Sequence, residues 1–85
     1  MKFEDAAEAV KTIDKADAFT RIIILSGGSA VSLRCKDIED VALIRAQMLL
    51  MISARNGPEI AIAVSDIYDI IFLFDPRPRE EEGSE

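Results

Sequence analysis

The chain has 85 residues, of which 49% are apolar and 31% charged, and its formal net charge is −6. This length and balance are typical of one small globular domain and exclude a fibrous or wholly disordered chain. The chain has no histidine and one cysteine, Cys35, which excludes histidine-based triads, an intramolecular disulfide and a zinc cluster made by this chain alone.

The N-terminal residues carry acids where a secretory signal peptide needs bases and a continuous apolar run. The most apolar stretch, residues 60–74, is interrupted by Asp66 and Asp69. No stretch therefore reaches the ~20 uncharged apolar residues of a membrane-spanning helix. We expect a cytoplasmic protein without a membrane segment.

Residues 3–16 are predicted to form the first helix, because alanine-rich composition favours helix and apolar residues recur at helical spacing. A helix of this length is marginal alone, so we expect it to pack on the rest of the domain. The apolar face that we expect to make this contact consists of Phe3, Ala6, Ala7, Val10 and Ile13.

Residues 20–36 are predicted to form an antiparallel β-hairpin that turns at Gly27 and Gly28, where both glycines can take a positive φ. The predicted register pairs Ile24 with Val31 and Ile22 with Leu33, which places residues of like polarity on the same face. The opposite face is half apolar and is either covered by the first helix or open to a partner; it carries Arg21, Ile23, Leu25, Ala30, Ser32 and Arg34.

Residues 37–56 are predicted to form a central helix. Asp37 is a favourable N-cap, and Asn56 with Gly57, followed by Pro58, is a typical helix end. The second half of this stretch is apolar around most of a helical circumference, so we expect it to be sandwiched within the chain, covered by a second chain, or both. The apolar dimer or partner surface that we predict consists of Leu43, Ala46 and Leu50.

Residues 59–74 fit two patterns. Alternation of Ile60, Ile62 and Val64 with alanine favours a strand at 59–64, followed by a turn at Ser65 and Asp66 and then a second strand or short helix. The alternative is one continuous helix over 59–74, because apolar residues also recur there at helical spacing. We find no internal repeat.

The predicted fold is therefore an α+β two-layer sandwich in the order α-β-β-α-β, followed by a further strand or short helix. In it, the hairpin at 20–36 packs on the central helix at 37–56. Residues 1–75 form one domain, because the prolines that follow Asp75 end regular structure. Residues 76–85 are predicted to be a disordered charged tail.

The sequence favours no catalytic or cofactor-dependent chemistry. Asp66 and Asp69 supply too few oxygen ligands for a hard cation, and the glycine pair at 27–28 lacks the residues of a phosphate-binding loop. Cys35 is expected to be a small buried apolar residue, with a reactive thiol as the alternative. We expect a protein that is not an enzyme and that has no cofactor and no metal.

The function that we predict is non-enzymatic binding of a larger protein, as an inhibitor or antagonist, by a small acidic homodimer. In one version the protein is phage-encoded and its acids imitate nucleic-acid phosphates, occupying the basic groove of a CRISPR or other defence nuclease. The expected acidic contacts are Glu59, Asp66, Asp69 and Asp75.

Two alternatives stay open. One is direct nucleic-acid binding through the basic hairpin, with Arg21, Arg34 and Lys36 as phosphate contacts, although the net charge of −6 disfavours it. The other is a structural subunit of a larger assembly, with the apolar surface as a permanent interface.

Overall fold

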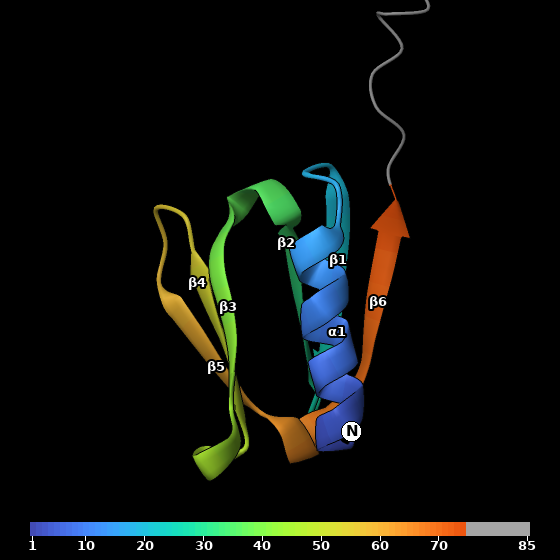
Figure 1. Cartoon of the computed structure of the whole chain (residues 1–85), viewed down its shortest axis with the longest axis vertical. Helices are drawn as coiled ribbons and strands as arrows, with labels where there is room; N and C mark the ends of the chain where they lie inside the picture. The colour runs from blue at the N-terminus through green and yellow to red at the C-terminus, as the bar shows by residue number, and fades with distance from the viewer. Residues whose placement is uncertain (75–85) are drawn as a thin grey trace, which may run out of the picture.

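A computed structural model describes residues 1–74 and shows an α+β fold, in which the N-terminal helix accompanies two three-stranded antiparallel sheets (Figure 1). The sheets have the strand orders β2-β1-β6 and β3-β4-β5. The predicted tail at 76–85 and the predicted contact Asp75 lie outside the described residues. The elements are α1 (Phe3–Lys15), β1 (Thr20–Ser26), β2 (Ser29–Arg34), β3 (Ile38–Ile44), β4 (Leu49–Ala54), β5 (Glu59–Ala63) and β6 (Ile67–Phe74), with short 3-10 turns η1 (Cys35–Asp37), η2 (Arg45–Gln47) and η3 (Val64–Asp66).

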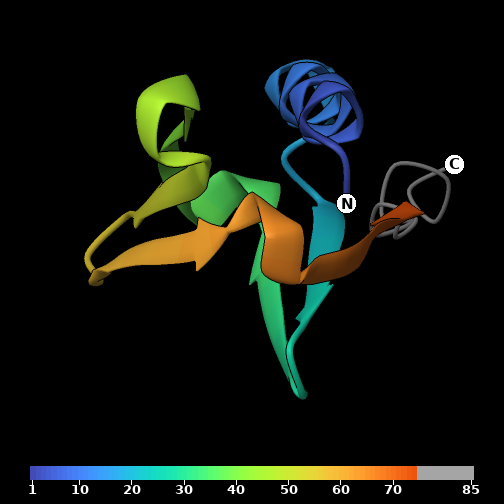
Figure 2. The same ribbon diagram turned by 90° about the horizontal axis from the view of Figure 1, so that it is seen from below.

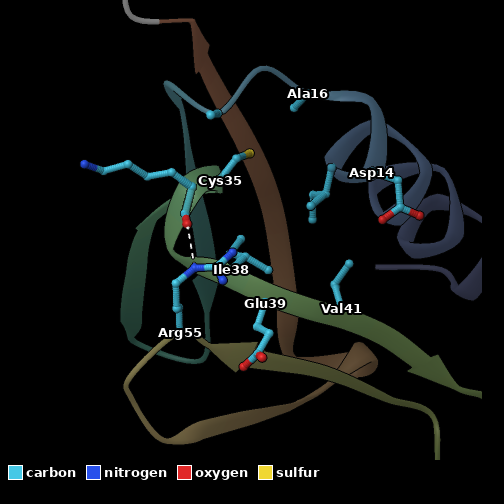
Figure 3. Close-up of a pocket in the computed structure, with 10 residues that line it drawn as sticks. Asp14, Ala16, Cys35, Ile38, Glu39, Val41 and Arg55 are labelled. Carbon is cyan, nitrogen blue, oxygen red and sulfur yellow. Dashed lines mark hydrogen bonds between the residues drawn. The ribbon is translucent and has the colours of Figure 1, made fainter.

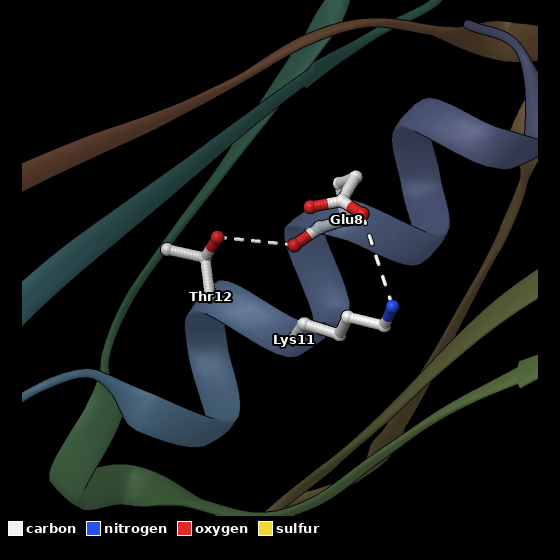
Figure 4. Close-up of polar contacts among 3 residues, drawn as sticks. All are labelled: Glu8, Lys11 and Thr12. Atoms are coloured by element: carbon white, nitrogen blue, oxygen red, sulfur yellow. Dashed lines mark hydrogen bonds and ion pairs between the residues drawn. The ribbon is translucent and has the colours of Figure 1, made fainter.

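The predicted first helix is confirmed as α1. Its buried residues are Ala6, Ala9 and Ile13, so the buried face is rotated slightly from the predicted one. On the exposed side, Lys11 Nζ lies 3.8 Å from Glu8 Oε2, and Thr12 Oγ1 donates to the Glu8 carbonyl at 3.0 Å (Figure 4). Exposed contacts of this kind contribute little, so burial of the apolar face is what holds α1 in place.

The predicted hairpin and its register are confirmed up to Arg34, whereas Cys35 and Lys36, which we placed at the hairpin's end, belong to η1. Ile22 pairs with Leu33, Ile24 with Val31, and the turn is closed by Ser26 and Ser29. Gly27 and Gly28 have φ values of 26° and 87°, in the region where glycine alone has no steric cost.

The predicted central helix at 37–56 is wrong: these residues form the end of η1, then β3, η2 and β4. Burial along β4 alternates, with Leu50 and Ile52 at 0% exposure and Leu49 and Met51 half-buried. The apolar residues of this segment recur at helical spacing as well as in this period-2 alternation. Pairing within the sheet favours the strand. Asn56, which we read as a helix end, is instead the left-handed residue (φ 59°) of the turn between β4 and β5.

The strand interpretation of residues 59–74 is confirmed, and the continuous-helix alternative is wrong. Strand β5 covers Glu59–Ala63, the predicted turn is η3, and β6 runs on to Phe74 as a second strand. Strand β6 pairs with β1 in the first sheet, whereas β5 pairs with β4 in the second.

The strands of residues 20–74 form two similar halves that exchange their last strands. Each half has two paired strands, a 3-10 turn and a third strand, and that third strand, β3 or β6, pairs with the first strand of the other half. The pattern D-I-x-D, at residues 37–40 and 66–69, begins with the last residue of η1 and of η3 and continues into the strand that follows. The halves also share a hydrogen bond: Arg55 N–H donates to the Asp37 carbonyl at 2.6 Å, and Gly27 N–H donates to the Asp66 carbonyl at 3.1 Å. The expectation of no internal repeat is therefore wrong.

The core lies where the inner faces of both sheets meet α1. Figure 2 shows α1 nearly end-on, lying to one side of the strands. The side chains of Ala9 and Ile13 on this helix join core residues from both sheets: Ile22, Ile24, Leu50, Ile52, Ile62, Ile67 and Ile70. Because α1 packs on the inner faces of the sheets, it does not cover the outer face of the hairpin. Such cover was one of the two expectations for that face from the sequence.

Candidate binding surfaces

The outer face of the sheet β3-β4-β5 is mainly apolar. Pairing of Met51 with both Ala42 and Ala61, while Leu50 and Ile52 point into the core, places these three residues on the side away from α1. Ala42 and Ala61 are exposed and Met51 is half-buried. We call this surface the β4 outer face; its apolar members are Ala42, Ile44, Leu49, Met51, Ala61 and Ala63.

One end of the β4 outer face is acidic. Ser53 on the central strand pairs with Asp40 on one side and Glu59 on the other, and both acids are exposed. Ser53 Oγ donates to Glu59 Oε2 at 3.2 Å, which orients that carboxylate. The predicted contact Glu59 therefore borders an apolar surface, together with Asp40, which the sequence analysis assigned to a helix.

The predicted contacts Asp66 and Asp69 lie together at the junction of η3 and β6, away from Glu59, which begins β5. Both are exposed, and Asp69 Oδ1 accepts the Ile70 N–H at 2.8 Å. Tyr68, between them, is 75% exposed. The structure thus divides the predicted acids between two places, and the fourth, Asp75, lies outside the described residues.

The predicted basic residues also separate. Arg21 and Arg34 are cross-strand partners on the outer face of the sheet β2-β1-β6, where Arg21 Nη1 donates to Ser32 Oγ at 3.4 Å. Lys36 belongs to η1, and its carbonyl accepts from Arg55 Nε at 3.2 Å. Sequence reasoning missed Arg55 because it was assigned to a helix end.

A pocket of about 360 Å³ opens between the C-terminal end of α1, η1 and the start of β3 (Figure 3). Its wall includes Ile13, Cys35 and Val41, and its charged lining residues are Asp14, Lys36, Glu39 and Arg55. The volume is that of a small ligand site. Two cations and two anions balance one another, so the lining has no net formal charge to favour an anionic or a cationic ligand.

The Cys35 thiol in this pocket is half-buried. Partial burial, with a smaller contribution from the negative charge of Asp17, raises the pKa of this thiol above its ordinary value. A raised pKa leaves less thiolate at neutral pH, so the electrostatics disfavour the reactive-thiol alternative.

We expect the rate at which Ellman's reagent modifies Cys35 to rise with pH, with its midpoint above that of the urea-unfolded protein, because folding disfavours the thiolate. Asp17→Asn removes one negative charge beside the thiol and should move the midpoint down. A folded-state midpoint at or below the unfolded one would contradict this assignment.

The predicted apolar partner surface requires a correction. Leu50 is 0% exposed and belongs to the core, so it cannot contact a partner. Leu43 packs against the same core, whereas Ala46 is exposed in η2. Leu43 and Leu50 are cross-strand partners on the core side of the sheet, whereas Ala46 lies in a turn, so the three residues do not form one exposed surface.

Comparison with known proteins finds no matching family model, no matching curated protein and no matching solved structure. Among residues 1–74, no helix is long and apolar enough to cross a membrane. In the same part of the chain, no group of three or more His, Cys, Asp or Glu side chains is placed to hold a metal ion.

Proposed function

We propose that the protein is a non-enzymatic binding module that engages a larger protein through the β4 outer face. The observation that supports this proposal is the combination of an apolar centre around Met51 with an acidic border at Asp40 and Glu59. Protein interfaces commonly have an apolar centre, in which methionine is enriched, and a polar rim.

The rigidity of this surface favours binding. Leu50 and Ile52 anchor the opposite side of β4 in the core at 0% exposure, and β4 is paired on both edges. A surface that is already ordered loses little conformational entropy when a partner binds.

The acidic border favours a partner with a basic surface. Charge complementarity mainly raises the association rate and selects the partner, while the apolar centre supplies the contact area. In the finer form of the proposal, the partner is a basic nucleic-acid-binding protein, such as a CRISPR or other defence nuclease, and the protein is its inhibitor. Asp40 and Glu59 would then occupy positions that phosphates take in the nucleic acid.

Met51→Lys is expected to weaken binding of the partner at least about 30-fold, the effect typical of a central interface residue. The partner is isolated by affinity capture on the wild-type protein from cells that produce it, and the dissociation constants are then measured by titration. Met48→Lys is the matched control, because it makes the same change at a 45% exposed turn residue outside this face.

The charge contribution is tested separately. Asp40→Asn with Glu59→Gln should weaken binding at low salt more than Glu4→Gln with Asp5→Asn, which removes the same charge from the exposed first turn of α1. The phosphate-imitating form also requires affinity to fall steeply with salt and nucleic acid to compete for the partner. Equal effects of Met51→Lys and Met48→Lys would reject the β4 outer face.

Direct nucleic-acid binding is the second candidate, because the cross-strand pairing of Arg21 with Arg34 places two cations side by side. A mobility shift with random duplex and single-stranded DNA at low salt tests this candidate. Absence of a shift at micromolar protein would reject it.

A further inference from the structure

Strand β6 forms one edge of the sheet β2-β1-β6, and no described strand pairs with its outer side. An open edge presents unpaired backbone N–H and C=O groups, and proteins usually protect such edges with lysine, proline or short strand length. Strand β6, IYDIIFLF, contains no lysine and no proline, and Asp69 is its one charged residue. It also carries Tyr68, Leu73 and Phe74, which are 75%, 43% and 70% exposed.

We propose that the outer edge of β6 pairs antiparallel with β6 of a second copy of this chain, around a two-fold axis at Ile71. The two sheets then join into one continuous sheet. This inference is independent of the proposed function, because no residue of the β4 outer face takes part.

The ends of the free edge locate the axis. At the start of β6, the N-terminal ammonium of Met1 donates to the Ile67 carbonyl at 2.7 Å, so that backbone group already has a partner. At the other end, the described part of β6 reaches Phe74. The midpoint of the remaining described stretch, residues 68–74, is Ile71; within this stretch the Ile70 N–H donates to Asp69 Oδ1 of its own chain at 2.8 Å, and a backbone partner would replace that side-chain contact.

The symmetry of a sheet supports the same register. A two-fold axis perpendicular to the sheet keeps each side chain on the same face of the joined sheet, and paired residues of antiparallel strands share a face. The residue at the axis must therefore face its own copy, because an axis between two residues would pair side chains from opposite faces. With Ile71 on the axis, Tyr68 lies opposite the partner's Phe74, and this contact occurs twice. The β1–β6 register shifts beside Ile67 and leaves Tyr68 without a cross-strand partner on β1.

A cysteine on the axis tests this register. In the Cys35→Ser background, Ile71→Cys faces its own copy, and the ~4.5–5.5 Å between Cα atoms of antiparallel partners suits a disulfide. Mild oxidation should therefore give a covalent dimer. Leu73→Cys in the same background faces the partner's Asp69 and should give little covalent dimer. Equal cross-linking of the two variants, or none with Ile71→Cys, would overturn the proposal.

A charge exchange tests it without cysteines. Tyr68→Lys and Phe74→Glu should each raise the dimer dissociation constant about tenfold or more, because each places a charge opposite an aromatic ring. The double variant places lysine opposite glutamate twice and should recover most of the affinity. Circular dichroism confirms that the variants remain folded, and Met51→Lys should leave the dimer intact. A double variant weaker than both single variants would overturn the pairing.

Discussion

Leu50→Ala is expected to lower the free energy of unfolding by about 2–5 kcal/mol, as measured by urea denaturation. Leu50 is 0% exposed and lies in the core that both sheets share with α1. Truncation leaves a cavity that the surrounding β-branched side chains fill poorly. Because small domains have about 5–15 kcal/mol of stability in total, this single change removes a large share of it.

The control for Leu50→Ala is Met51→Ala on the next residue of β4. Met51 is half-buried on the opposite side of the sheet, so its truncation should cost much less. The ratio of the two effects distinguishes a strand from the helix that the sequence suggested. Equal losses of stability at positions 50 and 51 would contradict the alternation on which the core depends.

Ile13→Ala is the second change with a large expected effect, again about 2–5 kcal/mol. Ile13 is the largest of the buried α1 residues, and at 7% exposure it joins the core with Ala9. The helix is too short to persist alone in water. We therefore expect thermal unfolding at a lower temperature, with the helical and sheet signals lost together.

Asp14→Ala, one position along the same helix, is the matched control. Asp14 is exposed, so this change should alter stability by no more than about 0.5 kcal/mol. If Ile13→Ala were as mild as Asp14→Ala, α1 would not be part of the cooperative core.

Local sequence signals were sufficient to predict α1 and the β1–β2 hairpin. In the hairpin, Gly27 and Gly28 fix the turn, and the alternation from Ile22 to Leu33 leaves one register in which both faces agree. The prediction for residues 59–74 was also right where alternation of isoleucine with alanine was clear, as in Ile60 and Ile62.

The helix prediction for residues 37–56 was wrong because several residues there fit both a helical and a strand pattern. Leu43 and Leu50 fit a helical face, but they are also cross-strand partners in β3 and β4. Asn56 with Gly57 is a strong hairpin signal as well as a helix end. These residues form strands because β4 pairs on both sides, with β3 and with β5. Sequence spacing alone does not reveal this pairing.

The candidate surfaces depended on that misassigned segment. The β4 outer face could not be predicted while Asp40 and Met51 were placed on a helix. The repeated D-I-x-D pattern at 37–40 and 66–69 was the available signal that both segments follow the same turn-to-strand path. The open edge of β6 depends on strand order, which follows from pairing between residues far apart in the chain.

The measurement that tests the self-pairing of β6 most directly is the molar mass of the wild-type protein by light scattering after size exclusion, at low and high salt. We expect about twice the 9.4 kDa of one chain, unchanged at high salt because backbone and apolar contacts dominate, and a shift toward 9.4 kDa for Tyr68→Lys. A wild-type mass of 9.4 kDa throughout the micromolar range would contradict the pairing.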